Sequence, residues 1–475
     1  MSCSLKRILF TTGGAIGLLA LVALAVPLVV DVNRFKPRLE AAASDALGMD
    51  ARVGRLGMGF ISGFHVTMED GRILSEHGVA VASAKRVRLW VELLPLLRRE
   101  VRLRRIELTQ PRLLIERGPG GRLNLEGLKK AAPLLCALDG ASVSLSDGTL
   151  LYTDRRSGSR VEARGFNLNV SRMRLAGGRS PQFLKGLSIQ AELTCGEIRT
   201  KDLSVFALKV FVDGKGGAFE LKPVTMGIFG GQLAGSLQAD VSGPVSSCRV
   251  RCSLPDFRIE EFLKILSPKQ AAQGAMDFSA SLSMRGRTMS ELVQTAAGDV
   301  SLRGENLALV GNDLDRRLSR FESSQNFNLV DVGAVFFAGP LGLAVTKGYN
   351  FAGLFRGSGG SSRIRTLVSD WRVERGVAQA KDVALATSEN RIALQGGLDF
   401  VNGRFAEVVV AVIDAGGCAR VRQAILGSFE RPVVEKPRVL TSLAGPVLKL
   451  YKQTRRLLPA GPCEVFYAGS VAPPR

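Results

Sequence analysis

The feature that most constrains this chain is an uncharged apolar run at residues 8–30, ILFTTGGAIGLLALVALAVPLVV, which follows Lys6 and Arg7. A helix of this length, at about 1.5 Å per residue, spans the hydrocarbon core of a bilayer. Basic residues favour the cytoplasmic side of a membrane, so the run predicts a cytoplasmic tail at residues 1–7 and a transmembrane anchor at residues 8–30. Everything after Asp31 is then expected to be exported.

A cleaved signal peptide is the competing interpretation of the same run. Ala23-Leu24-Ala25 has the A-x-A form of a cleavage site, and a basic region precedes it. The run nevertheless stays apolar as far as Val30, and Pro27 lies just beyond the cleavage point, where a peptidase needs an extended chain. We therefore favour the uncleaved anchor.

Charge and cysteines narrow the possible partners. A formal charge of +21 suits nucleic acid, but an exported chain meets none. Anionic lipid head groups or lipopolysaccharide phosphates are the expected binding partners, and a basic face that only keeps the protein soluble is the alternative.

The seven cysteines include no CxxC pair, which argues against a metal site. Cys248 and Cys252 share one strand face about 13 Å apart, too far for a mutual disulfide, while pairing with other cysteines stays open.

Beyond the anchor the sequence predicts a mainly β fold. A short helix from Asp31 to Leu47 ends at Gly48, and apolar and polar residues alternate from Ala51 onward. Residues 85–93, KRVRLWVEL, show this pattern, with every second side chain apolar. The apolar phase then changes across Arg104-Arg105, which predicts a β-bulge there.

Turn pairs and a few helices divide the rest of the pattern. We expect turns at Gln110-Pro111, Asp147-Gly148 and Asp213-Gly214, and helices at residues 259–266 and from the capping box Thr288–Glu291 up to Gly298. Because helices do not follow each strand, the sheet should be mostly antiparallel. About 25 strands in one sheet must twist and curl.

Three segments in succession resemble the N-terminal module of the AsmA family of Gram-negative envelope proteins. They are DVNRFKPRLEAAASDALGMDARVGRLGMGF (31–60), AKRVRLWVELLPLL (84–97) and RRIELTQPRLLIERGPGGRLNLEGL (104–128). Phe229-Gly230-Gly231, the helix at 259–266 and MRGRTMSELVQTAAGDVSLR (284–303) resemble that family's C-terminal module. The resemblance implies an inner-membrane anchor, a periplasmic β-groove of the bridge-like lipid-transfer type, and a role in phospholipid traffic or outer-membrane homeostasis.

With this resemblance, the predicted fold is an N-terminal transmembrane helix followed by a long, curled, mostly antiparallel β-sheet that forms an elongated hydrophobic groove, with a few short helices. We divide the exported part into an N-terminal β module (31–130), a middle β-groove with short helices (131–300) and a C-terminal module with an amphipathic helix (301–475). The same alternation of side chains would also build a sandwich core or a solenoid. The residues predicted to line the groove are Val87, Leu89, Val91, Val101 and Leu103.

The expected function is transfer of phospholipids between membranes by an inner-membrane protein whose bulk lies in the periplasm. We expect no cofactor, metal or nucleic-acid partner. Two histidines and the absence of HExxH, GxSxG and P-loop motifs argue against an enzyme. The alternative is a periplasmic scaffold that assists outer-membrane protein or lipopolysaccharide assembly, for example by capturing a strand at a sheet edge. A protein partner in the periplasm or the outer membrane stays open.

Two apolar features near the C-terminus have no obvious place in a plain sheet. Residues 332–345, VGAVFFAGPLGLAV, are uncharged but too short to span a membrane. Residues 446–458 predict a basic amphipathic helix that either contacts an anionic membrane or a partner, or caps the sheet edge. The residues predicted to make that membrane contact are Lys449, Lys452, Arg455 and Arg456.

Overall fold

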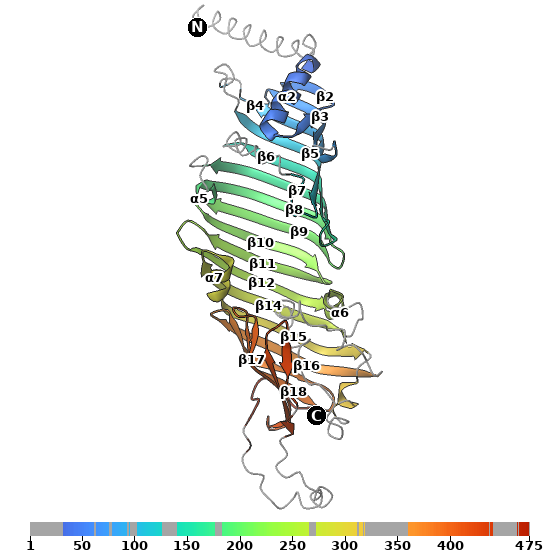
Figure 1. Cartoon of the computed structure of the whole chain (residues 1–475), viewed down its shortest axis with the longest axis vertical. Helices are drawn as coiled ribbons and strands as arrows, with labels where there is room; N and C mark the ends of the chain where they lie inside the picture. Colours follow the sequence, from blue (N-terminus) through green and yellow to red (C-terminus); the bar gives the residue numbers. More distant parts are fainter. Residues whose placement is uncertain are drawn as a thin grey trace, which may run out of the picture. The chain divides into compact units, whose positions relative to one another are not determined.

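The structure is a computed structural model that describes residues 32–60, 63–75, 78–92, 95, 102–125, 140–175, 183–265, 272–310, 313–316, 318, 360–436, 438–439, 463 and 465–474. It divides into two compact units, unit 1 (Met1–Pro223) and unit 2 (Val224–Arg475). Each unit consists mainly of β-strands with a few short helices (Figure 1), so the predicted mainly β class is confirmed. The five-part division of the chain stays a prediction.

Unit 1 starts with two helical segments and continues as a sheet. The predicted first helix is present and ends where glycine permits it, because Gly48 has φ 70° and its N–H donates to the Ser44 carbonyl. The elements are η1 (Val32–Phe35), α2 (Lys36–Leu47), β1 (Asp50–Arg52), β2 (Arg55–Gly59), β3 (His65–Leu74), β4 (Ala80–Val91), β5 (Leu103–Arg117), β6 (Ser142–Asp154), β7 (Ser159–Leu175), α5 (Phe183–Gly186), β8 (Leu187–Arg199) and β9 (Ser204–Lys215).

The strands of unit 1 pair in chain order. The short strands β1 and β2 both pair with β3, and β3 to β9 then follow one another across the sheet (Figure 1). Every one of these pairings is antiparallel except the parallel pair β5–β6. The predicted mostly antiparallel arrangement is therefore confirmed.

Side chains from the first helical segments accept hydrogen bonds from backbone N–H groups of β1, of β2 and of the link between them. Glu40 accepts a hydrogen bond from the backbone N–H of Val53, and Ser44 accepts one from Ala51. Asn33 accepts a third from the N–H of Leu56. An edge blunted in this way is a poorer template for a strand from another chain.

Unit 2 contains, among its described residues, two short helices and a long series of strands. Strand β10 (Ala218–Ile228) contains the boundary between the units. The other elements are β11 (Gly231–Asp240), β12 (Ser246–Arg258), α6 (Ile259–Leu263), β13 (Ala272–Gln273), β14 (Ala275–Gly286), α7 (Met289–Gln294), β15 (Ala297–Val310), β16 (Ser361–Glu374), β17 (Val377–Ala386), β18 (Arg391–Asp399), β19 (Arg404–Ile413), β20 (Ala419–Gly427), β21 (Pro432–Val434) and β22 (Arg438–Val439).

The strands of unit 2 are antiparallel throughout the described pairings. β12 pairs with β11 and β14, β15 pairs with β13, β14 and β16, and the order then runs to β20, which also pairs with β21 and β22. The predicted capping box is confirmed, because the Thr288 hydroxyl accepts from the Glu291 N–H at the start of α7. The helix ends at Gln294, earlier than predicted.

Unit 2 surrounds two buried apolar clusters. The larger joins Phe262 and Leu263 of α6 to apolar side chains of β12 and of β14 to β20. The smaller lies between β16 to β19 and a C-terminal strap, residues 465–474, which contributes Phe466, Tyr467 and Val471. A disulfide between Cys418 and Cys463 holds the chain next to this strap.

The four irregularities predicted in unit 1, one bulge and three turns, had mixed outcomes. The bulge is confirmed, since Trp90 pairs with Arg105 but Val91 pairs with Leu103, leaving Arg104 as the extra residue. The turns predicted at Gln110-Pro111 and Asp147-Gly148 are wrong, because both pairs lie inside continuous strands, β5 and β6. The turn expected at Asp213-Gly214 lies later, between β9 and β10.

Some predicted features lie outside the described residues. These are the anchor at residues 8–30, Val101, the apolar segment 332–345, and the basic helix at 446–458 with Lys449, Lys452, Arg455 and Arg456. Among the residues that the structure does describe, no helix combines the length and the apolar character needed to cross a membrane.

Candidate functional site

The candidate site is the apolar face of the unit 1 sheet. Strand pairing aligns its side chains into rows that cross seven strands, β3 to β9, a distance of about 29 Å at about 4.8 Å per strand. The first row is Met68, Val87, Leu108, Leu145, Leu168, Leu193 and Val210, and the second is Val66, Leu89, Ile106, Val143, Val170, Ala191 and Val212. A third row is Ile73, Ala82, Leu113, Leu150, Ala163, Ile198 and Val205.

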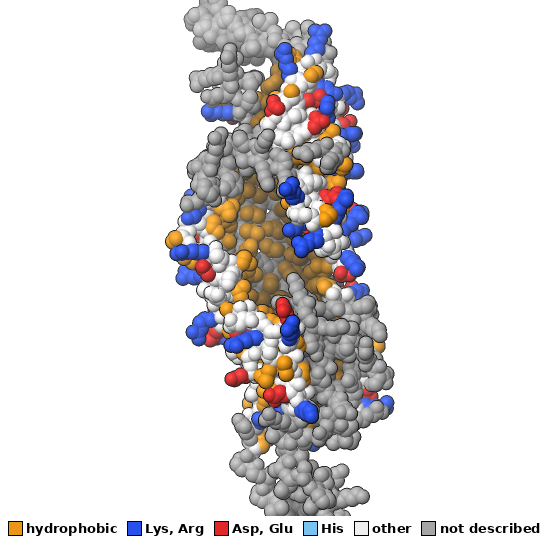
Figure 2. Space-filling view, in the orientation of Figure 1, with side chains coloured by type: hydrophobic (Ala, Val, Ile, Leu, Met, Phe, Trp, Pro, Cys, Tyr) orange, Lys and Arg blue, Asp and Glu red, His pale blue; other side chains and the backbone are white. Residues whose placement is uncertain are grey.

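These rows are only partly covered. Every member of the first row is half-buried, as is every member of the other two except Val170, Ala163 and Ala191. Figure 2 shows apolar side chains gathered in a hollow over β7 to β9. A contiguous apolar surface of this kind marks a site for an apolar ligand or partner.

The opposite face of the same strands carries charges. Arg86 pairs with Glu69 at 3.7 Å, and Arg88 pairs with Glu107 at 3.5 Å. Lys209 and Glu192 form a further pair at 2.9 Å between β9 and β8. The sheet is thus amphipathic, with cross-strand ion pairs on one face and uncharged rows on the other.

One crease crosses the strands between the first and third rows. We define the crease by the position on each strand where pairing is interrupted and the apolar residues change phase: Asp70, Lys85, Gln110, Asp147, Gly165, Gly196 and Ala207 on β3 to β9. On β3, for example, the apolar side chains are Val66 and Met68 before Asp70 and Ile73 after it. Five of the seven positions have positive φ, from 49° to 63°: Asp70, Gln110, Asp147, Gly165 and Ala207.

The extra residues of the crease belong to the polar face. The Gln110 side chain donates to Asp147 at 2.9 Å, and the N–H of Asp147 donates to the Asn167 side chain. Asn167 in turn donates to the Thr194 hydroxyl. At the crease, each strand therefore places one more residue on its polar face than on its apolar face. Bulge-like irregularities bend strands, and bends aligned on seven neighbours curve the sheet toward its apolar face.

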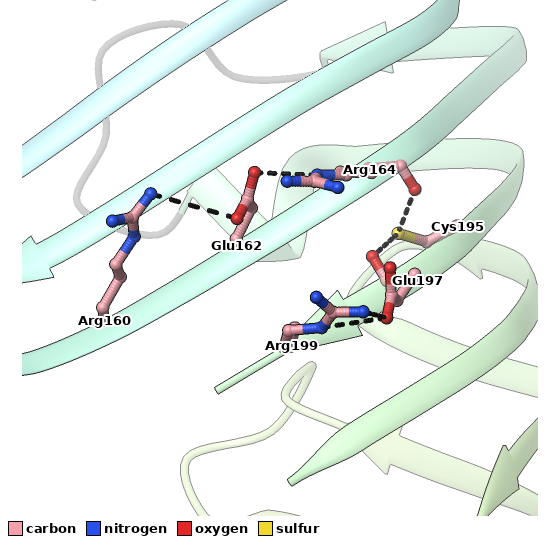
Figure 3. Close-up of polar contacts among 6 residues, drawn as sticks. All are labelled: Arg160, Glu162, Arg164, Cys195, Glu197 and Arg199. Atoms are coloured by element: carbon pink, nitrogen blue, oxygen red, sulfur yellow. Dashed lines mark hydrogen bonds and ion pairs between the residues drawn. The ribbon is translucent and has the colours of Figure 1, made fainter. Parts of the chain in front are cut away.

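Cys195 satisfies backbone groups at this crease (Figure 3). Its buried thiol lies 3.3 Å from the Arg164 carbonyl oxygen and 3.4 Å from that of Glu197, on either side of the unpaired glycines Gly165 and Gly196. Burial raises the pKa of the Cys195 thiol, which keeps it in the protonated form that can donate. The residue is a structural donor at a bend.

Ion pairs flank Cys195 on β7 and β8 (Figure 3). Arg164 donates to Glu162 at 2.8 Å, and Arg199 donates to Glu197 at 2.6 Å. The hydrogen bond from Arg164 lowers the pKa of Glu162 despite some desolvation. These charges remain on the polar face and do not enter the apolar rows.

Four of the five predicted lining residues are described, and two of these lie in the apolar rows. Val87 lies in the first row and Leu89 in the second, while Val91 pairs with Leu103 beyond the bulge. All four are half-buried. Their contact with a ligand stays a prediction. The sequence interpretation missed most of the rows, on β6 to β9, although their alternating pattern was visible.

Fold and site define a class of protein with a creased, amphipathic β-sheet that leaves one long apolar face partly open. The chain belongs to the AsmA family, whose model matches residues 5–178 and again residues 178–336, more than half of the sequence. The suspected family is therefore confirmed. Comparison with curated proteins found no match.

Proposed function

We propose that this protein is a non-enzymatic phospholipid carrier of the bacterial envelope, with lipid acyl chains lying on the apolar face of unit 1. The observation that carries the proposal is the set of aligned rows, because seven strands present uncharged, half-buried side chains with a charged face behind them. Membership of the AsmA family supports an envelope-related role.

Energetics support a groove as the route for a lipid. An acyl chain of about 15 methylenes loses about 12 kcal/mol on entering water, at about 0.8 kcal/mol per methylene. That cost makes unaided crossing of an aqueous compartment very slow. A curved apolar face offsets most of it, while the lipid head group stays in water at the open side.

The proposed location is the inner membrane, with the anchor at residues 8–30 and the bulk of the chain in the periplasm. The disulfide between Cys418 and Cys463 supports an oxidising compartment. In this arrangement the chain meets phospholipids and two membranes but no nucleic acid. A reporter fused after Arg475 should be active only in the periplasm.

The test of lipid binding uses one strand and two opposite faces. Leu168 lies in the first apolar row of β7, and its neighbour Asn169 is exposed on the other face. We expect Leu168→Asp in the full chain to lower the amount of phospholipid that remains after purification, because an unpaired carboxylate among acyl chains is costly. Asn169→Asp makes the same charge change without contacting the rows and should retain wild-type lipid.

Mass spectrometry of extracted lipids measures the outcome, and circular dichroism with thermal melting checks that both variants fold. Lipid that surrounds the proposed anchor remains in both variants and sets the baseline. Equal lipid in folded Leu168→Asp, Asn169→Asp and wild-type protein would contradict the carrier function and favour a scaffold for envelope assembly.

A further inference from the structure

Three neighbouring turns form one rim of the apolar face. They connect strand ends at Arg117–Leu123, Asp154–Ser159 and Thr200–Leu203. Arg117 pairs with Asp154 in the sheet, and the N–H of Arg155 donates to the Arg117 carbonyl, so the first two turns are adjacent. The third lies beside the start of β7, where Glu162 pairs with Arg199. We call these turns the three-turn rim.

Part of the positive charge on this rim is matched by carboxylates. Arg117 lies 3.8 Å from Asp154, and Arg155 pairs with Glu116. Arg199 pairs with Glu197 at 2.6 Å. These arginines therefore have acidic partners within the protein.

Three further cations on the rim have no ion-pair partner among the described residues: Arg122, Arg156 and Lys201, one in each turn. All three are exposed, and Asp202 is the acidic residue that accompanies them. Figure 2 shows Lys and Arg side chains along an edge of the apolar hollow. Charges that the protein leaves unmatched in a row are available to an anionic ligand.

The rim is continuous with the apolar rows on the same strands. Ile198 of the third row is three residues before Lys201, about 10 Å at about 3.3 Å per residue. On β6, Leu150 of the same row precedes the turn that carries Arg156. A ligand with acyl chains on the rows thus has its head group within reach of the rim cations.

We propose that the three-turn rim binds the head group of a glycerophospholipid with net negative charge, and selects it over zwitterionic lipids because the same cations repel the ammonium group of a zwitterionic head group. This inference rests on the proposed carrier function. Arginine suits the role because its planar donors match two phosphate oxygens. Exposed contacts of this kind are individually weak and weaken further with salt, so the result is a preference among lipids.

The test is competition between two lipids for the full chain. Purified protein is incubated in detergent micelles with equimolar phosphatidylglycerol and phosphatidylethanolamine, repurified, and its lipids are quantified by mass spectrometry. We expect phosphatidylglycerol to be enriched about three- to fivefold over phosphatidylethanolamine at low ionic strength, the combined effect of a few exposed contacts. The enrichment should fall toward the input ratio in about 0.5 M salt.

Two triple variants lose the same charge at opposite ends of the strands. Arg122→Gln/Arg156→Gln/Lys201→Gln neutralises the rim and should still bind lipid above the Leu168→Asp baseline, but at the input ratio. The matched control, Arg174→Gln/Lys185→Gln/Lys215→Gln, removes three cations from the other strand ends and should keep the enrichment. Circular dichroism verifies folding of both, and the folded Leu168→Asp variant supplies the baseline of lipid bound elsewhere.

The outcomes separate the two proposals. Wild-type protein that binds no lipid above the Leu168→Asp baseline contradicts the carrier function. Wild-type protein that binds lipid at the input ratio leaves the carrier function intact and overturns the preference. Equal loss of enrichment in both triple variants would assign the effect to net charge and overturn the assignment to the rim.

Discussion

Unit 1 and unit 2 are built from similar strands but differ in how far their apolar side chains are buried. The largest fully buried side chains of the described residues all belong to unit 2: Phe257, Leu263, Met276, Leu307, Leu314, Ile364, Leu367, Leu385 and Ile392. In unit 1 the buried apolar residues are often alanines, while the larger side chains of the rows stay half-buried. The comparison shows that an alternating sequence specifies an amphipathic strand, and separate elements decide whether its apolar face is covered.

Two elements cover apolar surfaces of unit 2, helix α6 and the C-terminal strap. Helix α6 contributes Ile259, Phe262 and Leu263 to the larger cluster. The C-terminal strap covers a second surface, where Phe466 and Tyr467 pack on alanines of β17 to β19. Arg391 fixes the strap by donating to the Val471 carbonyl at 2.8 Å. The part of unit 2 next to α6 and the strap is therefore a closed core, whereas the apolar face of unit 1 stays partly uncovered.

The largest expected difference is between equal truncations in the two units. Leu367→Ala removes a fully buried side chain of unit 2 and should lower the free energy of unfolding by about 3–5 kcal/mol, because a cavity remains. Leu168→Ala truncates a half-buried residue of unit 1 and should cost less than about 1.5 kcal/mol.

The two tryptophans of the chain separate these effects, because Trp90 lies in unit 1 and Trp371 in unit 2. Denaturant unfolding followed by fluorescence in Trp90→Phe and Trp371→Phe backgrounds reports each unit in turn. Losses of similar size for the two leucines would contradict the distinction between an open face and a closed core.

A smaller effect, again confined to unit 2, is expected from its disulfide. Cys418 and Cys463 are 45 residues apart, so their bond restricts a long loop of the unfolded chain. Cys418→Ser/Cys463→Ser should lower the stability reported by Trp371 by about 2–4 kcal/mol and leave the Trp90 transition unchanged. Cys248→Ser removes a free thiol and serves as the control. A shift in both transitions would mean that the strap also stabilises unit 1.

A third prediction concerns the crease of unit 1. Gly165 has φ 63°, a conformation that strains β-branched residues, so Gly165→Val should cost about 1–3 kcal/mol in the Trp90 transition. Gly165→Asn, which tolerates this conformation better, is the matched control and should cost less. If the crease shapes the apolar face, folded Gly165→Val protein should also retain less lipid than the control. Equal stability of the two variants would show that the position is not conformationally restricted.

The crease also explains where sequence interpretation failed. Gln110-Pro111 and Asp147-Gly148 have turn composition, and Gln110 and Asp147 do adopt positive φ, but inside β5 and β6. Tight turns and bends within a strand both contain a residue with positive φ, so residue type alone does not distinguish a turn from a bend. The phase change of the flanking apolar residues was the available signal, as it was for the confirmed bulge at Arg104.

Strand alternation, the first helix and the capping box were predictable because they depend on residues close in sequence. The closure of unit 2 was not, since the strap reaches β16 to β19 through contacts such as that of Arg391 with Val471, 80 residues apart. The three-turn rim was hidden for a similar reason. The net charge was known, but only the pairing of strands shows which arginines have carboxylates beside them.

The smallest expected effect is a pH dependence that belongs to the strap. Burial alone would raise the pKa of Asp382, but hydrogen bonds from Ser470 and Tyr467 outweigh it and lower the pKa. A carboxyl group whose pKa is lower in the folded state stabilises the protein above its unfolded value, about 3.9, and loses that contribution as the pH falls through the folded value. Unit 2 should therefore lose stability below about pH 4, and Asp382→Asn should make this loss shallower in the Trp371 transition.

Part of the pH dependence should remain in Asp382→Asn, because the pKa of Asp399 is also lowered by hydrogen bonds from Asn402 that outweigh burial. Glu162→Gln, on the polar face of unit 1, should alter only the Trp90 transition. An unchanged acid profile of Trp371 in Asp382→Asn would mean that the Asp382 carboxylate adds no stability to the strap beyond its other contacts.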